Sequence, residues 1–137
     1  MREIKFRAWS EPTKEMEYNI TSIDFKGETV YFDSGVTSPN KEQETDYWHK
    51  PFVLMQYTGL KDKNGVEIYE RDIVRYEDGE FGYIGVVTED CYYFYIDGIS
   101  PLDSFSFADV SSTYDHSTEL FVIGNMYENH ELLEVLG

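Results

Sequence analysis

The chain has 137 residues, of which 41% are hydrophobic and 17% aromatic, so it is long and apolar enough for one folded domain with a single core. No apolar run approaches the ~20 residues of a membrane helix, and the N-terminus lacks the apolar stretch of a secretion signal. Cys91 is the only cysteine, which excludes a disulfide framework, and we therefore expect a cytoplasmic protein.

The net charge of −16 is distributed unevenly along the chain. Residues 76–137 carry 13 of the 27 acidic residues and no Lys or Arg, which gives them a net charge of −13. Because affinity for nucleic acid rests largely on Lys and Arg that neutralise phosphates, we expect this half not to bind nucleic acid directly. Its field would instead attract a basic partner, with the attraction screened by salt.

The first part of the chain predicts short strands and one long loop. Residues 3–9 alternate apolar and polar side chains, which is the pattern of a half-buried strand. A proline marks a turn at residues 11–14, and further strands are expected up to residue 35. Residues 36–50 are polar and show no period, so we expect a surface loop there.

The second part of the chain predicts a small barrel over residues 52–127, because short apolar runs alternate with turns and glycine-marked bends. The pair Asn64–Gly65 between two of these runs indicates a tight hairpin turn, since both residues accept positive φ. Residues 129–136 predict a short helix with Asn129 as its N-cap. Its apolar surface exceeds what so short a helix buries alone, so it must pack on the barrel or on another subunit.

Four blocks of sequence stand out in this chain: IKFRAW at residues 4–9, LMQYTGLKDKNG at 54–65, EIYE with DIV at 67–74, and VIGNMYEN at 122–129. Together they resemble the signature blocks of the YopX-like family of bacteriophage and prophage proteins, and none of them is a catalytic motif. The resemblance implies a phage-encoded protein with an SH3-like small barrel in its C-terminal part. The function of the family is not established, so the resemblance supplies no functional residues.

Three positions depart from the pattern of that family. Ser10 stands where the family usually has Asp, Arg71 where it usually has Gly, and His130 where it usually has Pro. A side chain at a position of positive φ would be strained, so we expect Arg71 to occupy a turn that tolerates a Cβ. His130 weakens the expected start of the helix without removing it.

Several groups of residues suggest metal sites, and each has a simpler interpretation. Residues 62–65 are similar to part of a calcium loop, but the first and twelfth positions of that loop would be Leu60 and Arg71, so a hairpin turn is preferred. The aspartates that recur every six residues are better explained as solvated loop residues, and the histidines lack the spacing of a zinc site. These residues are Asp97, Asp103, Asp109 and Asp115, and His49, His116 and His130.

Other candidate sites depend on Cys91, on aromatic residues and on a few basic residues. Cys91 is not favoured as a nucleophile, because burial in its apolar surroundings would raise the pKa of the thiol. The four aromatic residues at 92–95 could stack on single-stranded nucleic acid, but a half without Lys or Arg favours core packing. Arg2, Lys5 and Arg7 could form a modest nucleic-acid patch, although they are too few for strong binding.

The sequence thus predicts a mainly β protein, a small SH3-like barrel with additional N-terminal strands and a short C-terminal helix. We expect a non-enzymatic phage accessory protein that works without a cofactor in the host cytoplasm and contacts a host or phage protein, or a second copy of itself. An alternative is an acidic decoy that imitates phosphate charge and occupies a basic nucleic-acid-binding protein of the host. An enzyme is a third alternative, although no acid–base or nucleophile pairing stands out. The candidate interaction surface consists of Glu77, Asp78, Glu80, Glu89 and Asp90.

Overall fold

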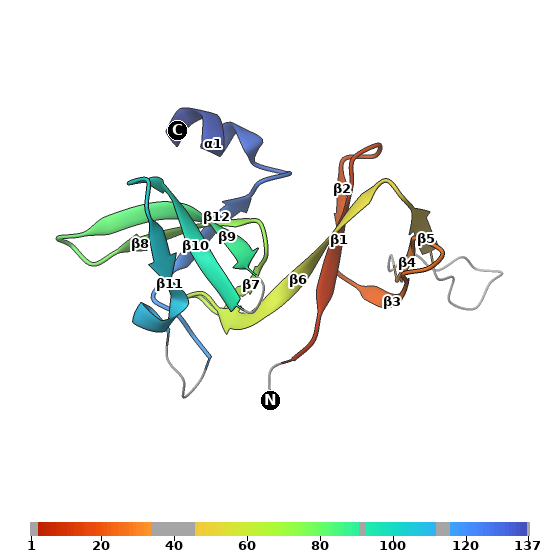
Figure 1. Ribbon diagram of the computed structural model, residues 1–137, viewed down its shortest axis with the longest axis horizontal. Helices are drawn as coiled ribbons and strands as arrows, with labels where there is room; N and C mark the ends of the chain where they lie inside the picture. The colour runs from red at the N-terminus through yellow and green to blue at the C-terminus, as the bar shows by residue number, and fades with distance from the viewer. Residues whose placement is uncertain (1–2, 34–45, 91–92, 112–115, 137) are drawn as a thin grey trace. The chain divides into compact units, whose positions relative to one another are not determined.

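The structure is a computed structural model that describes residues 3–33, 46–90, 93–111 and 116–136 (Figure 1). The chain divides into two compact units, and the boundary falls within one strand, β6. Lys5–Gln56 form the N-terminal unit, and Met1–Ile4 with Tyr57–Gly137 form the half-barrel unit. Within the described residues, no helix has the length and apolar character needed to cross a membrane.

The elements of the described residues are mostly short strands. In chain order they are β1 (Phe6–Ser10), β2 (Glu15–Glu17), β3 (Ile20–Asp24), β4 (Thr29–Phe32), β5 (Asp46–His49), β6 (Phe52–Lys61), β7 (Glu67–Tyr69), β8 (Asp72–Glu77), β9 (Gly82–Asp90), β10 (Tyr93–Ser100), β11 (Ser104–Ser106), the 3-10 helix η1 (Phe107–Asp109), β12 (Phe121–Asn125) and the helix α1 (His130–Leu136).

In the N-terminal unit, β1 pairs with β2 on one side and with the first half of β6 on the other, both antiparallel. The prediction that this strand is half-buried is wrong, because Arg7, Ala8 and Trp9 are all buried. Alternation places Arg7 on a solvent face, but its guanidinium instead lies 5.7 Å from the centre of the Tyr18 ring and donates to the Tyr18 hydroxyl at 3.4 Å. An arginine with an aromatic partner and an apolar stem tolerates such burial.

A second sheet of the N-terminal unit has the order β3-β4-β5, with antiparallel pairs. Because β5 occupies residues 46–49, the prediction of a loop over residues 36–50 is wrong there, and the part before residue 46 lies outside the described residues. β5 forms because it has aromatic partners on β4. The ring of Trp48 packs on Phe32 with centroids 4.7 Å apart.

The half-barrel unit is built on an antiparallel sheet with the order β11-β10-β9-β8-β12, which curls into a half-barrel (Figure 1). Its hydrophobic core includes Ile68, Val74, Val87, Ile96 and Leu120, all fully buried. β6 reaches this unit as well, where Tyr57 and Lys61 pair with β7. The predicted fold class, mainly β with a small barrel and a short C-terminal helix, is confirmed.

The turn between β6 and β7 confirms the hairpin predicted from Asn64–Gly65. Gly65 has a φ of 85°, in the left-handed region that glycine enters without steric cost. The Gly65 amide donates to the Asp62 carbonyl at 3.0 Å, and the Asp62 amide donates to the Val66 carbonyl at 2.7 Å. Asn64 does not have positive φ, which matches a hairpin loop in which one left-handed residue follows an ordinary turn.

Arg71 joins β7 to β8 with a φ of 69°, so the expectation of a turn that accommodates its Cβ without strain is wrong. In this region the Cβ of an L-residue crowds the backbone, which costs roughly 1–2 kcal/mol. Backbone hydrogen bonds fix the conformation on both sides. The Arg71 amide donates to the Val87 carbonyl at 2.8 Å, and the Arg71 carbonyl accepts from the Met126 amide at 2.9 Å.

Helix α1 is present where the sequence predicts it, but the expected capping by the Asn129 side chain is wrong. Oδ1 of Asn129 instead accepts the amide of Asn125 at 3.1 Å, so this side chain holds the end of β12. The start of the helix is fixed by a backbone bond from the Leu132 amide to the Asn129 carbonyl at 2.9 Å. Glu131 lies in the first turn, where the helix dipole favours an acidic residue.

Candidate interaction surface

Three of the conspicuous sequence blocks meet in the half-barrel unit, two of them at Asp62, which is 2% exposed. Oδ1 of Asp62 accepts the amides of Asn64 at 2.8 Å and Val66 at 2.9 Å. Oδ2 accepts the amide of Val122 at 3.0 Å, from a block 60 residues further along the chain. The carboxylate therefore holds the β6–β7 turn against β12, and its use by three amides favours the hairpin over the calcium-loop interpretation.

A second group of side-chain hydrogen bonds closes the block at the C-terminus. Oδ1 of Asn125 accepts the amides of Tyr127 at 3.0 Å and Glu128 at 2.8 Å, and Nδ2 donates to Oε1 of Glu128 at 3.0 Å. Asn129 lies over Gly124, where an added Cβ would be 2.6 Å from its Oδ1. The polar residues of these blocks thus satisfy backbone groups and fix loops, so their contribution is structural.

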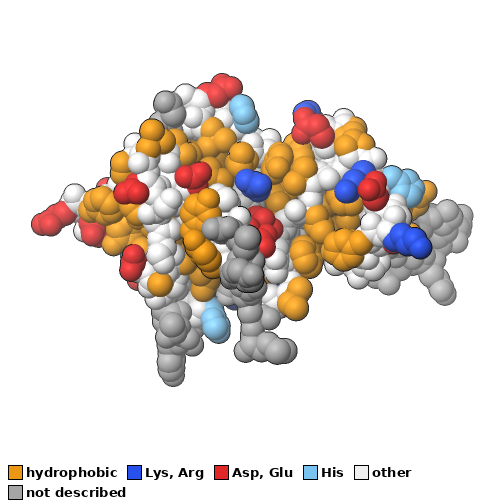
Figure 2. Space-filling model, viewed as in Figure 1, with side chains coloured by type: hydrophobic (Ala, Val, Ile, Leu, Met, Phe, Trp, Pro, Cys, Tyr) orange, Lys and Arg blue, Asp and Glu red, His pale blue; other side chains and the backbone are white. Residues whose placement is uncertain are grey.

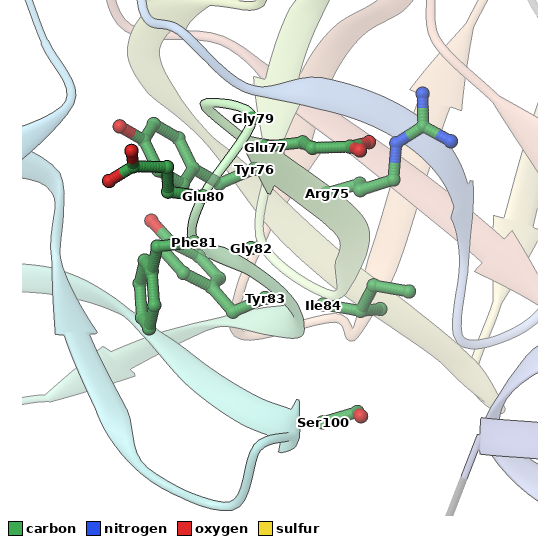
Figure 3. Close-up of a pocket in the computed structure, with 10 residues that line it drawn as sticks. All are labelled: Arg75, Tyr76, Glu77, Gly79, Glu80, Phe81, Gly82, Tyr83, Ile84 and Ser100. Atoms are coloured by element: carbon green, nitrogen blue, oxygen red, sulfur yellow. The ribbon is translucent and has the colours of Figure 1, made fainter.

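A cleft of about 320 Å³ lies at the hairpin between β8 and β9, and we call it the hairpin cleft (Figure 3). Tyr76 and Tyr83 are directly paired across the two strands. Figure 3 shows the aromatic side chains and Glu80 on one side of the hairpin and Arg75 and Ile84 on the other, as strand alternation requires. The cleft is lined by Arg75, Tyr76, Glu77, Gly79, Glu80, Phe81, Gly82, Tyr83, Ile84 and Ser100.

Tyr83 is the centre of an aromatic cluster. Its ring stacks on Phe105 at 3.8 Å and on Tyr76 at 5.2 Å, and the ring of Phe81 meets it edge-on at 6.1 Å. Tyr83 is 4% exposed, and its hydroxyl has no hydrogen-bond partner among the described residues. Burial, together with the nearby Tyr76 and Asp109, raises the pKa of Tyr83 to about 12, so the hydroxyl keeps its proton at neutral pH.

Three of the predicted acidic residues, Glu77, Asp78 and Glu80, lie exposed in or next to the β8–β9 turn. Asp78 also builds this turn, because its Oδ1 accepts the amides of Glu80 at 3.1 Å and Phe81 at 2.7 Å. These backbone bonds lower the pKa of the Asp78 carboxyl. The turn therefore holds Phe81, which is 49% exposed, among carboxylates.

The other two predicted acidic residues belong to the opposite end of β9. Glu89 is exposed there, and the backbone of Asp90 ends the strand, while the Asp90 side chain lies outside the described part of the structure. Because a strand rises about 3.3 Å per residue, β9 separates Glu89 from the turn by roughly 20 Å. On the face that Figure 2 displays, the acidic side chains of this unit are scattered among hydrophobic ones.

The remaining acidic and histidine candidates do not gather into a cluster. Among the described residues, no group of three or more His, Cys, Asp or Glu side chains is placed to hold a metal ion. Cys91 and Asp115 lie outside the described residues. The exposed candidates, which lie on β10, on η1, in connecting loops and at the start of α1, are Asp97, Asp103, Asp109, His116 and His130.

Thr29 and His49 form a close hydroxyl–imidazole pair between β4 and β5, with 2.7 Å between Oγ1 and Nδ1. The Thr29 hydroxyl donates its hydrogen to the Gly27 carbonyl at 2.9 Å, so it accepts from the imidazole in this pair. A general base must accept the proton of its nucleophile, and here the direction is reversed. Thr29 is also only 3% exposed, so the pair is structural.

The two nucleic-acid hypotheses find little support in the described residues. Arg7 is buried against Tyr18, which removes it from the N-terminal basic patch, and Arg2 lies outside the described residues. In the aromatic run at 92–95, Phe94 packs against the core as predicted, whereas Tyr93 is 59% exposed. β10 and the strands paired with it, β9 and β11, contain no Lys or Arg, so they do not supply the cationic groove that single-strand binders need.

The aromatic residues of the cleft are missing from the site that the sequence predicts. Tyr83 is part of a predicted strand, and its partner Phe105 comes from β11, a strand too short to show a period. One indication was available, because Phe81 directly follows an acidic turn and a hairpin end exposes its side chains.

The architecture defines a class of small, mainly β proteins with a half-barrel sheet and a short C-terminal helix. The family model described as YopX protein matches residues 5–134, so the chain belongs to this family. Protein EF1440 from Enterococcus faecalis has a similar crystal structure, with 31% identity and a TM-score of 0.66 over 97% of this chain and 99% of that one.

The crystal structure of YopX from Bacillus subtilis is similar too, with 20% identity and a TM-score of 0.62 over 96% of this chain and 98% of that one. At this identity the likeness shows the fold alone. The comparison with curated proteins found no match.

Proposed function

We propose that the protein is a non-enzymatic, phage-encoded interaction module that binds a host or phage protein through the hairpin cleft. The observation that carries this proposal is Phe81, an aromatic side chain that is 49% exposed on a turn fixed by Asp78. Exposed aromatic residues beside preformed hollows are typical anchors of protein interfaces. In this proposal the protein acts in the host cytoplasm and needs no cofactor.

The positions of the family's conspicuous residues support an interaction module over an enzyme. Asp62 and Asn125 are buried, and their side-chain oxygens accept backbone amides. A catalytic group must reach a substrate, and these side chains do not. The hairpin cleft instead offers stacked rings and carboxylates, which suit recognition.

The test is capture by the tagged full chain from phage-infected cells, followed by mass spectrometry and binding measurements with the purified partner. We expect one partner that is lost with Phe81→Ala and kept with Leu102→Ala. The second variant is a matched control, because Leu102 is also an exposed apolar residue of the half-barrel unit, at 87%. A partner that binds both variants equally would contradict the proposal.

The acidic-decoy function is the second candidate, motivated by the net charge of −13 over residues 76–137. A decoy needs a contiguous acidic surface, because scattered charges create little field. The same capture experiment separates the two functions. A decoy would lose its partner steeply as salt rises and would compete with DNA for it, whereas binding anchored by Phe81 would persist at moderate salt.

A further inference from the structure

We propose that the hairpin cleft binds an arginine side chain presented by a basic segment of the partner protein. This inference rests on the proposed function and specifies the chemistry of the ligand. Three features of the half-barrel unit carry it: a buried hydroxyl that has no partner among the described residues, carboxylates at the same hairpin, and an exposed ring beside it.

The buried hydroxyl belongs to Tyr83, which is 4% exposed and has no hydrogen-bond partner among the described residues. Buried polar groups are nearly always paired, and an unpaired one lowers stability. With a pKa of about 12 the group is neutral, so its oxygen is free to accept a hydrogen bond from a donor. Tyr83 lines the hairpin cleft, and a donor from a ligand there would satisfy it.

The carboxylates favour a cationic donor. Glu80 lies on the aromatic side of the hairpin in Figure 3, and Asp109 adds to burial and Tyr76 in raising the pKa of Tyr83. Asp78 accepts the Tyr76 hydroxyl at 3.4 Å, and burial followed by the charge of Asp78 raises the pKa of Tyr76. A cation placed against Tyr76 and Tyr83 would be attracted by the carboxylates of Asp78 and Glu80, with a smaller contribution from Asp109.

The nearby basic residues are engaged elsewhere and do not neutralise these carboxylates. Arg75 projects to the other side of the hairpin in Figure 3, and its guanidinium lies 5.5 Å from the centre of the Phe121 ring. Lys63 lies 5.8 Å from the same ring and pairs with Glu119 at 3.6 Å. From Tyr76 onward the chain has no Lys or Arg of its own, and in this proposal the cation comes from another molecule.

The rings favour arginine over lysine as the source of the cation. A guanidinium is planar, stacks on aromatic faces and donates several hydrogen bonds at once, whereas an ammonium is a compact and strongly hydrated charge. Phe81 offers an exposed ring next to Tyr83, at 6.1 Å. Since the Tyr83 oxygen is buried in the free protein, binding requires a side chain to move, and half-exposed Phe81 has the freedom to do so.

The test uses the full chain and three short acetylated, amidated peptides that differ only in three central residues: arginine, lysine or citrulline. Citrulline keeps the shape of arginine without its charge. Two-dimensional ¹H–¹⁵N NMR spectra should show shifts at the amides of residues 76–84 with the arginine peptide. The lysine peptide should bind several-fold more weakly, and the citrulline peptide should cause no shifts.

Three variants locate the binding. Tyr83→Phe should lower the affinity for the arginine peptide roughly tenfold, because the acceptor hydroxyl is lost. The same variant should raise the Tm of the free protein, because a buried hydroxyl that has no partner among the described residues is removed. Glu80→Gln should weaken binding several-fold. Glu89→Gln is the matched control, since it removes an exposed carboxylate at the far end of β9. This variant should bind the arginine peptide with the same affinity as the wild type.

The inference is overturned if the citrulline or lysine peptide binds as well as the arginine peptide, if the shifts fall outside the hairpin, or if Tyr83→Phe binds with unchanged affinity. Its failure is distinguishable from failure of the proposed function. If Phe81→Ala abolishes binding of the partner but the wild-type protein does not bind the arginine peptide, the proposed interaction module stands. Only the proposal that its ligand is an arginine side chain is then refuted.

Discussion

The two units of the chain differ sharply in charge. The N-terminal unit contains 6 basic and 9 acidic residues, for a net charge of −3, whereas the half-barrel unit contains 5 basic and 18 acidic residues, for a net charge of −13. The units also differ in the charge of their buried polar residues. Those of the N-terminal unit include the cationic Arg7 and the neutral Thr29, whereas those of the half-barrel unit include the acidic Asp62 and Asp72 and the neutral Asn125.

These buried residues show that the acidic side chains of the half-barrel unit have two separate uses. Asp62 and Asp72 face inward and accept backbone amides, for example the amide of Tyr69 at 2.8 Å from Asp72 Oδ2. Glu77 and Glu80 face solvent at the hairpin cleft. Net charge alone therefore overstates the acidic surface, and only the exposed group is available to a partner.

The grooves of the two units also differ in how much charge they carry. The N-terminal unit has a mostly apolar groove of about 360 Å³ lined by residues such as Ile23, Phe25 and Leu54, with the ion pair Lys50–Glu28 at its edge. The one basic residue of its lining, Lys50, is thus paired within the unit. The hairpin cleft contains exposed carboxylates and the Tyr83 hydroxyl, which has no hydrogen-bond partner among the described residues, and the proposed ligand would satisfy both.

The largest effect on stability is expected when an inward-facing carboxylate is removed. Asp62→Ala leaves three amides without their acceptor, so we expect a loss of about 3 kcal/mol in the free energy of unfolding, measured by urea denaturation. Asp78→Ala is the matched control, because it also removes an acceptor of two turn amides but at an exposed site, and should cost clearly less. Equal losses of stability in both variants would contradict the distinction between inward-facing structural carboxylates and solvent-exposed ones.

A smaller effect is expected at Arg71, whose φ of 69° strains the half-barrel unit. Arg71→Gly relieves that strain but adds freedom to the unfolded chain, so we expect a net gain of about 0.5 kcal/mol. Arg71→Ala keeps the Cβ and should give no gain. If the alanine variant gained as much in thermal unfolding, the side chain rather than the backbone would be the cause.

The smallest effect concerns Glu17 in the N-terminal unit. Partial burial, and next the neighbouring carboxylates of Glu15, Asp46 and Asp33, raise its pKa, so the folded state binds its proton more tightly than the unfolded state does. Stability therefore falls as the pH rises through the pKa of this group. Glu17→Gln should add a few tenths of a kcal/mol at pH 7, after allowance for solvent screening, and nothing at pH 3. A gain that is the same at both pH values would rule out the charge as its cause.

The sequence predicted the structure correctly where a feature depends on residues that are neighbours along the chain. The Asn64–Gly65 turn and the alternating strands of the half-barrel follow from the preferences of neighbouring residues. The burial of Arg7 could not be predicted that way, because it depends on Tyr18, which belongs to a later part of the chain. The strand β5 was missed for the same reason, since it is held by aromatic partners on β4.

The candidate site was predicted in part. The acidic turn residues Glu77, Asp78 and Glu80 are exposed together, but Glu89 is not with them. This separation could have been predicted, because a strand rises about 3.3 Å per residue and an apolar run lies between the turn and Glu89. The stacking of Tyr83 on Phe105, in contrast, depends on the order β11-β10-β9, which no local pattern specifies.

The carboxylate of Asp62 also has a consequence for the order in which the half-barrel unit folds. Its bonds to Asn64 and Val66 close within a single turn, and such local contacts form quickly. Its bond to Val122 spans 60 residues, so the entropy of closing that long loop must be overcome first. During synthesis, we therefore expect Oδ2 of Asp62 to gain its protein partner only after β12 has left the ribosome.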